Sequence, residues 1–238
     1  MLKMLAETAA SLVFPSECEL CQIPLQPFPP SGVCDACRSQ IRWIAPPHCR
    51  GCGRTVRAEG NACSECFGKT FPFERALASA IYEGAMKDLI HVYKFGSRKY
   101  LKNFFTDILS DFLSQNTNPA IFDCVAAIPM DPVKKNERGF NQSELLSAAL
   151  ARSLGRPDHT RHISRIKHSQ SQHLLKKKER MANVKDSFRA VGGEFFKQKN
   201  VLLVDDILTT GQTASECAKV LKKEGASSVT LLVLARGA

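Results

Sequence analysis

The sequence has 238 residues, of which 44% are hydrophobic and 24% are charged, enough for one or two domains with a real core. This composition excludes a disordered chain, and no apolar stretch approaches the roughly 20 residues that span a bilayer. The formal net charge is +10, which favours anionic partners. At the N-terminus, Glu7 interrupts an apolar segment that has no clean cleavage site. We therefore expect a short amphipathic helix and a cytoplasmic protein, with a secretion signal as the alternative.

Eight of the ten cysteines form CxxC pairs near the N-terminus. These pairs are Cys18 and Cys21, Cys34 and Cys37, Cys49 and Cys52, and Cys63 and Cys66. Pairing neighbouring CxxC motifs gives C-x2-C-x12-C-x2-C and then C-x2-C-x10-C-x2-C. This is the pattern of a double zinc ribbon, because each CxxC turn supplies two thiolates and two turns complete a tetrahedral Zn²⁺ site. We predict two structural zinc sites in a domain over residues 1–70, which could not bury a core without metal.

Other interpretations of the cysteines remain open at this stage. A disulfide framework belongs to oxidising compartments, an iron–sulfur cluster also uses four cysteines, and spacing does not exclude crossed pairing of the motifs. Five arginines lie around the pairs, so direct contact with nucleic acid is an alternative to a structural or docking role. They are Arg38, Arg42, Arg50, Arg54 and Arg57. The remaining Cys124 and Cys217 lie in apolar or helical contexts and read as core residues.

Beyond residue 70, strand and helix patterns alternate along the chain. We expect strands over 76–84, 121–129, 162–166, 200–206 and 227–236, and helices over 85–95, 99–115, 141–155 and 213–226. This alternation predicts an α/β domain with a parallel sheet over residues 71–238. In such sheets ligands bind beyond the carboxyl ends of the strands.

The most apolar strand ends in two adjacent acids, in the segment VLLVDDILTTGQT. Asp205 and Asp206 are followed by Thr209, Thr210, Gly211, Gln212 and Thr213. Hydroxyls and backbone N–H groups at a helix N-terminus suit a phosphate monoester, and a pair of carboxylates suits ribose hydroxyls or Mg²⁺. The pattern is therefore that of a cradle for a sugar phosphate, and the alternative is a capped turn with the aspartates paired to lysines.

A basic block lies before this segment. Between Arg161 and Lys199 there are eleven lysines and arginines against three acids, a balance of +8. Such a block attracts phosphate on a nucleotide, a sugar or a nucleic acid, and the alternative is a solvated surface.

Together these motifs resemble the ComF/GntX family, which is associated in bacteria with DNA uptake and utilisation. The acidic segment is similar to the 5-phosphoribosyl-1-pyrophosphate (PRPP) binding motif of type I phosphoribosyltransferases. Three further segments resemble those of the family: YEGAMKDLIHVYKFGSRKYL, IPMDPVKKNERGFNQSELLSAAL and RIKHSQSQHLLKKKERMANVKDSF. Ser169 stands where the family usually has threonine, and a hydroxyl is retained. The likeness implies a type I phosphoribosyltransferase-like domain preceded by the double zinc ribbon.

The resemblance also implies roles for individual residues. Asp205 and Asp206 would hold the ribose hydroxyls with Mg²⁺, and residues 209–213 would hold the 5-phosphate. The turn after Pro129 takes the place of the pyrophosphate-binding loop, and residues 165–183 take the place of a mobile loop that closes over the substrate. The candidates that these two segments contribute are Arg138, Asn141, Gln142, Arg165, Lys167, Gln172 and Arg180, and Lys94 is a further binding candidate. The catalytic candidates are Asp205, Asp206, Arg165 and Arg180.

Two functions follow from this reading. The first is an enzyme that transfers a phosphoribosyl group from PRPP to an acceptor that the sequence does not identify. The second is a non-catalytic factor with DNA-uptake proteins as partners. It would bind single-stranded DNA through the zinc ribbons and through residues 165–183, which we call the basic loop. An amidotransferase activity lacks support, because no catalytic cysteine follows Met1.

Overall fold

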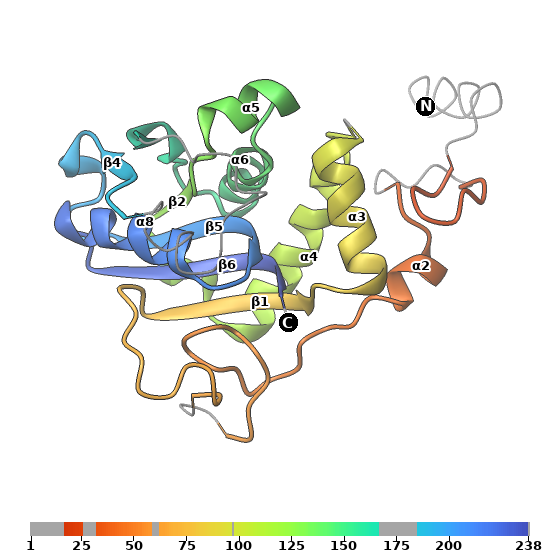
Figure 1. Cartoon of the computed structure of the whole chain (residues 1–238), viewed down its shortest axis with the longest axis horizontal. Helices are drawn as coiled ribbons and strands as arrows, with labels where there is room; N and C mark the ends of the chain where they lie inside the picture. The colour runs from red at the N-terminus through yellow and green to blue at the C-terminus, as the bar shows by residue number, and fades with distance from the viewer. Residues whose placement is uncertain (1–16, 26–31, 59–61, 97, 167–184, 238) are drawn as a thin grey trace.

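The computed structural model describes residues 17–25, 32–58, 62–96, 98–166 and 185–237 (Figure 1). The expected N-terminal helix lies outside the described residues, as do Lys167, Gln172 and Arg180 of the basic loop. Among the described residues, no helix combines the length and the apolarity needed to cross a bilayer.

A four-stranded sheet forms the centre of the fold, and its order is β1-β6-β5-β2. Every neighbouring pair in it is parallel, which confirms the predicted α/β class. Its strands are β1 (Arg75–Ile81), β2 (Cys124–Ala127), β5 (Asn200–Leu208) and β6 (Ser228–Arg236). Strand β5 pairs with β2 only as far as Val204 but continues along β6 to its own end. The last residues of β5 therefore extend beyond the edge strand β2.

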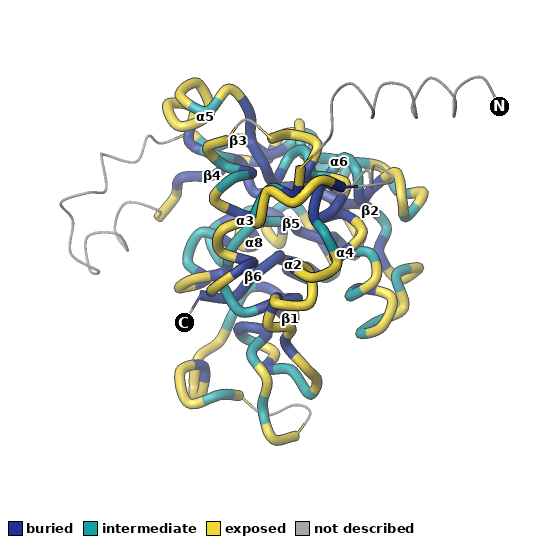
Figure 2. Tube along the Cα trace, turned by 90° about the vertical axis from the view of Figure 1, so that its right-hand side faces the viewer, coloured by how far each residue is buried: buried dark blue, intermediate teal, exposed yellow. Residues whose placement is uncertain are grey.

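Both faces of the sheet are buried, which explains why its strands are nearly continuous runs of apolar residues. Alternate residues of a strand point to opposite faces. In β5, Leu202 and Val204 join one hydrophobic cluster, and Val201 and Leu203 join another. Figure 2 shows this buried centre surrounded by exposed segments.

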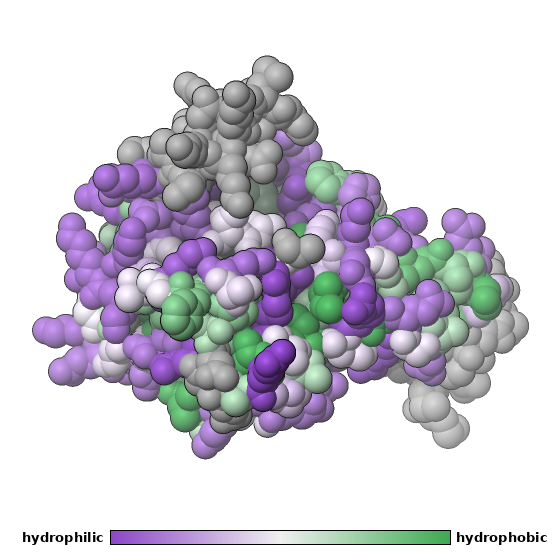
Figure 3. Space-filling model, turned by 60° about the horizontal axis from the view of Figure 1, so that its bottom comes forward, coloured by the Kyte–Doolittle hydropathy of each residue, from purple (hydrophilic) through white to green (hydrophobic). Residues whose placement is uncertain are grey.

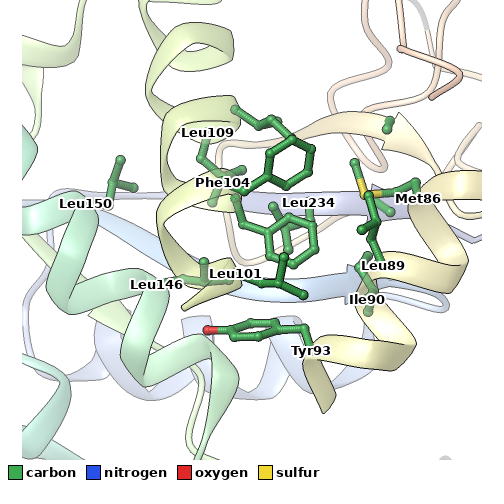
Figure 4. Close-up of a cluster of buried hydrophobic side chains, with 14 of the residues drawn as sticks. Met86, Leu89, Ile90, Tyr93, Leu101, Phe104, Leu109, Leu146, Leu150 and Leu234 are labelled. Carbon is green, nitrogen blue, oxygen red and sulfur yellow. The ribbon is translucent and has the colours of Figure 1, made fainter. Parts of the chain in front are cut away.

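Helices cover both faces. The described α-helices are α2 (Asp35–Ser39), α3 (Gly84–Phe95), α4 (Leu101–Asn116), α5 (Pro132–Arg138), α6 (Gln142–Leu154) and α8 (Gln212–Lys223). The apolar sides of α3, α4 and α6 meet over one face, where Tyr93, Phe104 and Leu146 lie close together (Figure 4). Helix α8 packs on the other face through Cys217 and Leu221. The sheet is thus sandwiched between two helical layers.

The long predicted elements are confirmed to within a few residues, and two differences concern short ones. Strand β3 (Ile163–Arg165) pairs antiparallel with β4 (Phe188–Ala190) in a separate two-stranded sheet rather than in the main sheet. Helix α5 was not expected, because its seven residues carry no apolar period. Capping forms it instead: Asp131 accepts from the Val133 N–H, and Gly139 ends it at φ 76°.

The cysteine-rich segment follows the outer edge of β1. The Ala76 N–H donates to the Arg50 carbonyl at 2.8 Å, and the Ile44 N–H donates to the Ser79 carbonyl at 2.9 Å. These bonds occupy backbone groups that an edge strand leaves unpaired. In Figure 3 this side of the molecule is mostly hydrophilic, with apolar side chains in separate groups.

Candidate functional site

The eight CxxC cysteines form two clusters. The first cluster is Cys18, Cys21, Cys34 and Cys37, and the second is Cys49, Cys52, Cys63 and Cys66. In each, all four sulfur atoms lie within 4.8 Å of one another. The motifs are therefore paired as neighbours along the sequence, and crossed pairing is wrong.

The donor sets of both clusters fit tetrahedral zinc. Zn–S bonds of about 2.3 Å place tetrahedral sulfurs roughly 3.8 Å apart, and one Sγ–Sγ distance in each cluster is 3.6 Å. All ten cysteines are free, so the disulfide framework is absent. Burial opposes ionisation of Cys18, but backbone N–H groups that point at its sulfur lower its pKa to about 6. The same balance lowers the pKa of Cys49 to about 7, and thiolates are the form that binds zinc.

The predicted phosphate cradle, residues 209–213, joins the end of β5 to the start of α8. Thr209 and Thr210 are exposed. Gly211 is the N-cap of α8 at φ 74°, in the left-handed region that favours glycine. The 12-residue helix starts at Gln212, one residue before its predicted start, and its N-terminus carries no side-chain cap. Its dipole therefore presents partial positive charge to the 209–213 loop.

Asp205 lies inside β5 rather than at its end, and it is paired in register with Val233 of β6. Its Oδ1 accepts from the Ser143 hydroxyl and from the Asp206 backbone N–H, both at 2.9 Å. Burial, together with the charge of Asp206, raises the pKa of Asp205 to about 7, although these hydrogen bonds and Lys94 lower it. This acid therefore titrates near neutrality and is fixed to the N-terminus of α6.

Asp206 is engaged with helix α3 instead. Its Oδ2 lies 2.8 Å from Nζ of Lys94, and the two side chains are only 13% and 15% exposed. Arg138, at the end of α5, stacks over the Phe95 ring at 4.7 Å. Burial lowers the pKa of Arg138, and the charge of Asp206 opposes this effect. The structure thus gathers Lys94, Arg138 and Asp206, which the sequence had placed on three separate segments.

The other candidates in the turn after Pro129 are largely occupied by structural contacts. Asn141 caps α6: its Oδ1 accepts from the Ser143 N–H at 3.1 Å, and its Nδ2 donates to the Ile128 carbonyl at 3.3 Å. Gln142 is fully buried, and neither atom of its amide has a hydrogen-bond partner among the described residues. Such an orphaned amide is costly and marks a place where a polar partner belongs.

Arg165, in β3, stacks over Phe188 of β4 at 5.6 Å. Burial lowers its pKa, and the nearby charge of Asp131 opposes this effect. Asp131 itself is 2% exposed and begins α5. Arg165 therefore lies near the start of α5, the helix that ends at Arg138.

Sequence reasoning missed two residues that shape this region. Ser143 connects α6 to Asp205, and the only sequence signal was its place two residues after a capping asparagine. Arg236, at the end of β6, is 6% exposed and donates to the Leu208 carbonyl at 3.2 Å. A terminal arginine after an apolar strand reads as a surface residue, so its burial was not predictable from the pattern.

A parallel α/β sheet with an acid pair and a glycine-containing loop before a helix, preceded by two four-cysteine sites, defines a phosphoribosyltransferase-fold protein with a double zinc ribbon. The sequence matches the double zinc ribbon domain over residues 9–72 and the phosphoribosyl transferase domain over residues 141–238. The chain belongs to the ComF/GntX family.

Curated relatives extend along nearly the whole chain. The DNA utilization protein YhgH of Salmonella typhimurium is 30% identical over 229 residues, which are 94% of this chain and 99% of that protein. Competence protein F of Haemophilus influenzae is 29% identical over 210 residues, which are 87% and 91% of the two chains. Among solved structures, adenine phosphoribosyltransferase from Thermoanaerobacter pseudethanolicus aligns with a TM-score of 0.37 at 16% identity, over 59% of this chain and 82% of that one.

Proposed function

We propose that the chain binds PRPP with Mg²⁺ at the carboxyl end of β5 and transfers its phosphoribosyl group to an acceptor. The observation that supports this most is that the strand carrying two carboxylates, Asp205 and Asp206, is followed directly by the threonine-rich loop at the start of α8. The two groups are spaced along one strand–loop–helix unit, as the two ends of a ribose 5-phosphate require.

In this proposal the 5-phosphate is held by Thr209, Thr210, Gly211 and Thr213, with the backbone N–H of Gln212. The ribose hydroxyls and Mg²⁺ are held by the aspartates, which offer the hard oxygen ligands that Mg²⁺ prefers. Lys94 must then move away from Asp206 or share it with the ligand, because its ammonium occupies one carboxylate oxygen.

The reaction breaks the bond between the anomeric carbon and the pyrophosphate oxygen, and a bond from that carbon to the acceptor forms. Negative charge grows on the departing pyrophosphate, so cationic donors near it lower the barrier. Arg138 and Arg165 are the described cationic candidates, Lys167 and Arg180 are the others, and Gln172 would add a neutral amide donor. Mg²⁺ supplies further charge neutralisation when bound.

The test is calorimetric titration of PRPP with Mg²⁺ into zinc-loaded protein, together with a pyrophosphate-release assay. We expect binding in the wild type and its loss in the double variant Asp205→Asn with Asp206→Asn, with two zinc ions retained. Unchanged binding in that variant would show that the site is wrongly assigned. Binding without release in the presence of free bases and single-stranded DNA would leave a PRPP-binding protein that does not use these acceptors.

A second candidate function, binding of single-stranded DNA, is favoured by a cleft of about 670 Å³ between the second cysteine cluster and α8. Its charged lining has four cations and one acid: Arg50, Lys69, Lys219, Lys222 and Glu74. The partly buried ring of Phe71 also lines it, stacked at 5.1 Å on Phe73, which is buried. Single strands bind grooves that combine cations with an accessible aromatic ring.

Salt dependence tests this second function. Removing two phosphate contacts in Arg50→Gln with Lys69→Gln should reduce the slope of log K against log salt by roughly 1.4, since single strands release about 0.7 counterion per contact. The matched control is Lys135→Gln with Lys134→Gln, on helix α5 and outside the cleft lining. Equal slopes for both double variants would exclude the cleft as the DNA site.

A further inference from the structure

In the sequence, Glu65 lies between Cys63 and Cys66, two members of the second cluster. Its Oε2 accepts a hydrogen bond from Nη2 of Arg236 at 3.1 Å, and its Oε1 accepts one from Nη1 of Arg54 at 3.1 Å. The two arginines differ in burial, because the Arg236 side chain is 7% exposed and the Arg54 side chain 36%. The zinc turn is therefore connected to the interior through Arg236.

The other terminal nitrogen of the same guanidinium, Nη1, binds the residue that precedes the 209–213 loop. Nη1 of Arg236 donates to the Leu208 carbonyl at 3.2 Å and also to the Gly237 carbonyl. The Gly237 N–H donates to the same Leu208 carbonyl at 2.9 Å. Leu208 directly precedes Thr209, and a Cβ placed on Gly237 would lie 3.4 Å from the Thr209 methyl. Two donors thus fix the carbonyl of the residue that directly precedes the loop.

We propose that Arg236 is a positioning residue that couples the second cysteine cluster to the 209–213 loop, so that zinc occupancy of this cluster sets the loop's order and its affinity for phosphate. The affinity part of this statement rests on the proposed PRPP function, whereas the ordering of the loop does not. A planar guanidinium holds a carboxylate and a carbonyl in a fixed relative geometry through two donor nitrogens, whereas an ammonium is a compact point charge on a flexible stem.

The physical reason is preorganisation. An exposed loop that closes on a phosphate loses conformational freedom, and prior fixation of its first residue reduces that cost. Structural zinc turns fold only with metal, so loss of zinc releases Glu65 and then Arg236. Coupling between two ligands is reciprocal, so phosphate binding must strengthen zinc retention by the same factor.

Hydrogen exchange of the backbone amides of residues 209–213 in the ligand-free, zinc-loaded full chain tests the link directly. We expect Arg236→Met to raise their exchange rates about tenfold, the effect of losing a charged hydrogen bond. The matched control is Arg54→Met, which removes the other partner of Glu65 without touching Leu208, and its rates should stay within about twofold of the wild type. If Arg236→Met loses zinc or fails to fold, two milder variants give the test. Arg236→Lys keeps the positive charge, and Glu65→Gln keeps the size of the side chain.

Two outcomes separate this inference from the proposed function. If Arg236→Lys and Glu65→Gln exchange no faster than Arg54→Met, the coupling is wrong, whether or not PRPP binds. If exchange rises but wild-type protein binds neither PRPP nor inorganic phosphate, the coupling stands and the PRPP proposal fails. If PRPP binds, its dissociation constant should rise about tenfold in Arg236→Met, and PRPP should slow zinc transfer from the wild-type second cluster to a chelator.

Discussion

The ion pair between Lys94 and Asp206 gives a prediction with a built-in control. Lys94→Met removes the cation that faces an acid pair, while the methionine keeps the length and apolar stem of the side chain. Breaking a buried ion pair costs about 3–5 kcal/mol, and breaking an exposed one costs about 0–1 kcal/mol. At 15% and 13% exposure, we expect a loss of about 2–3 kcal/mol in the free energy of unfolding near pH 8. The matched control, Lys135→Met, breaks a pair with Glu144 of the same 2.8 Å length but 46% and 32% exposure, and should lose under about 1 kcal/mol.

The loss should depend on pH, and its sign follows from Asp205. A carboxyl whose folded pKa is raised holds a proton that the unfolded chain has released, so its penalty on stability is complete above the folded pKa and declines to zero as the pH falls to the unfolded pKa. The pKa of Asp205 is about 7 with Lys94 present, and Lys94 lowers it. Without Lys94 that pKa rises further, so protonation relieves the variant as the pH falls. We expect the deficit to shrink to about 1 kcal/mol near pH 5.5.

Urea unfolding followed by circular dichroism at both pH values measures this effect. Millimolar Mg²⁺ should also stabilise Lys94→Met more than the wild type, because a second cation can then approach Asp206. Equal losses for Lys94→Met and Lys135→Met near pH 8 would refute the reasoning. So would a Lys94→Met deficit that is the same at both pH values.

Three further predictions concern the proton, the metal and the loop. Because the pKa of Asp205 is about 7, binding of Mg²⁺ and PRPP should release a proton and weaken as the pH falls from about 8 to about 6; calorimetry in two buffers of different ionisation enthalpy measures it. Cys49→Ser should reduce bound zinc from two ions to one per chain, while Cys124→Ser, equally buried but outside the clusters, keeps both, as elemental analysis will report. Gly211→Ala and Gly68→Ala, at φ 74° and 71°, should each cost about 1 kcal/mol in unfolding, but only Gly211→Ala should weaken PRPP binding.

The sequence predicts most of this fold because its elements carry strong periodic signals. The runs that became β5 and β6 are nearly all apolar, and helix α6 ends at Gly155, which adopts φ 61° as a C-terminal glycine does. CxxC spacing predicted the zinc ligands for a similar reason, since the two-residue gap is local. The short elements α5 and β4 were not predicted, and β3 was predicted as a strand without its antiparallel pairing, because capping and tertiary pairing determine these features rather than a period.

The candidate site was predictable in part, for a comparable reason. The segment from Asp205 to Thr213 is contiguous, so its sequence alone indicates a binding site for a sugar phosphate. The partners of that segment come from distant positions: Ser143, Lys94 and Arg236 meet it only through the sheet order β1-β6-β5-β2. The boundary between the two domains at residue 70, and the roles given to the loop residues beyond Ile166, stay predictions.

The two adjacent aspartates are not equivalent, and strand geometry explains why. Successive side chains of β5 point to opposite faces, so Asp206 follows Leu202 and Val204 toward helix α3. Asp205 lies on the side of Val201 and Leu203, where burial raises the pKa of the Cys217 thiol in α8 and the charge of Asp205 adds to this shift. The same carboxylate also accepts from Ser143 at the start of α6.

One acid is therefore balanced by a lysine and remains open to a ligand, whereas the other is buried, bound to Ser143 and half-protonated near neutrality. An acid pair in this state carries less than two negative charges until a cation arrives. If Mg²⁺ binds here as proposed, it would displace the remaining proton and recruit the second charge, so its affinity should rise with pH.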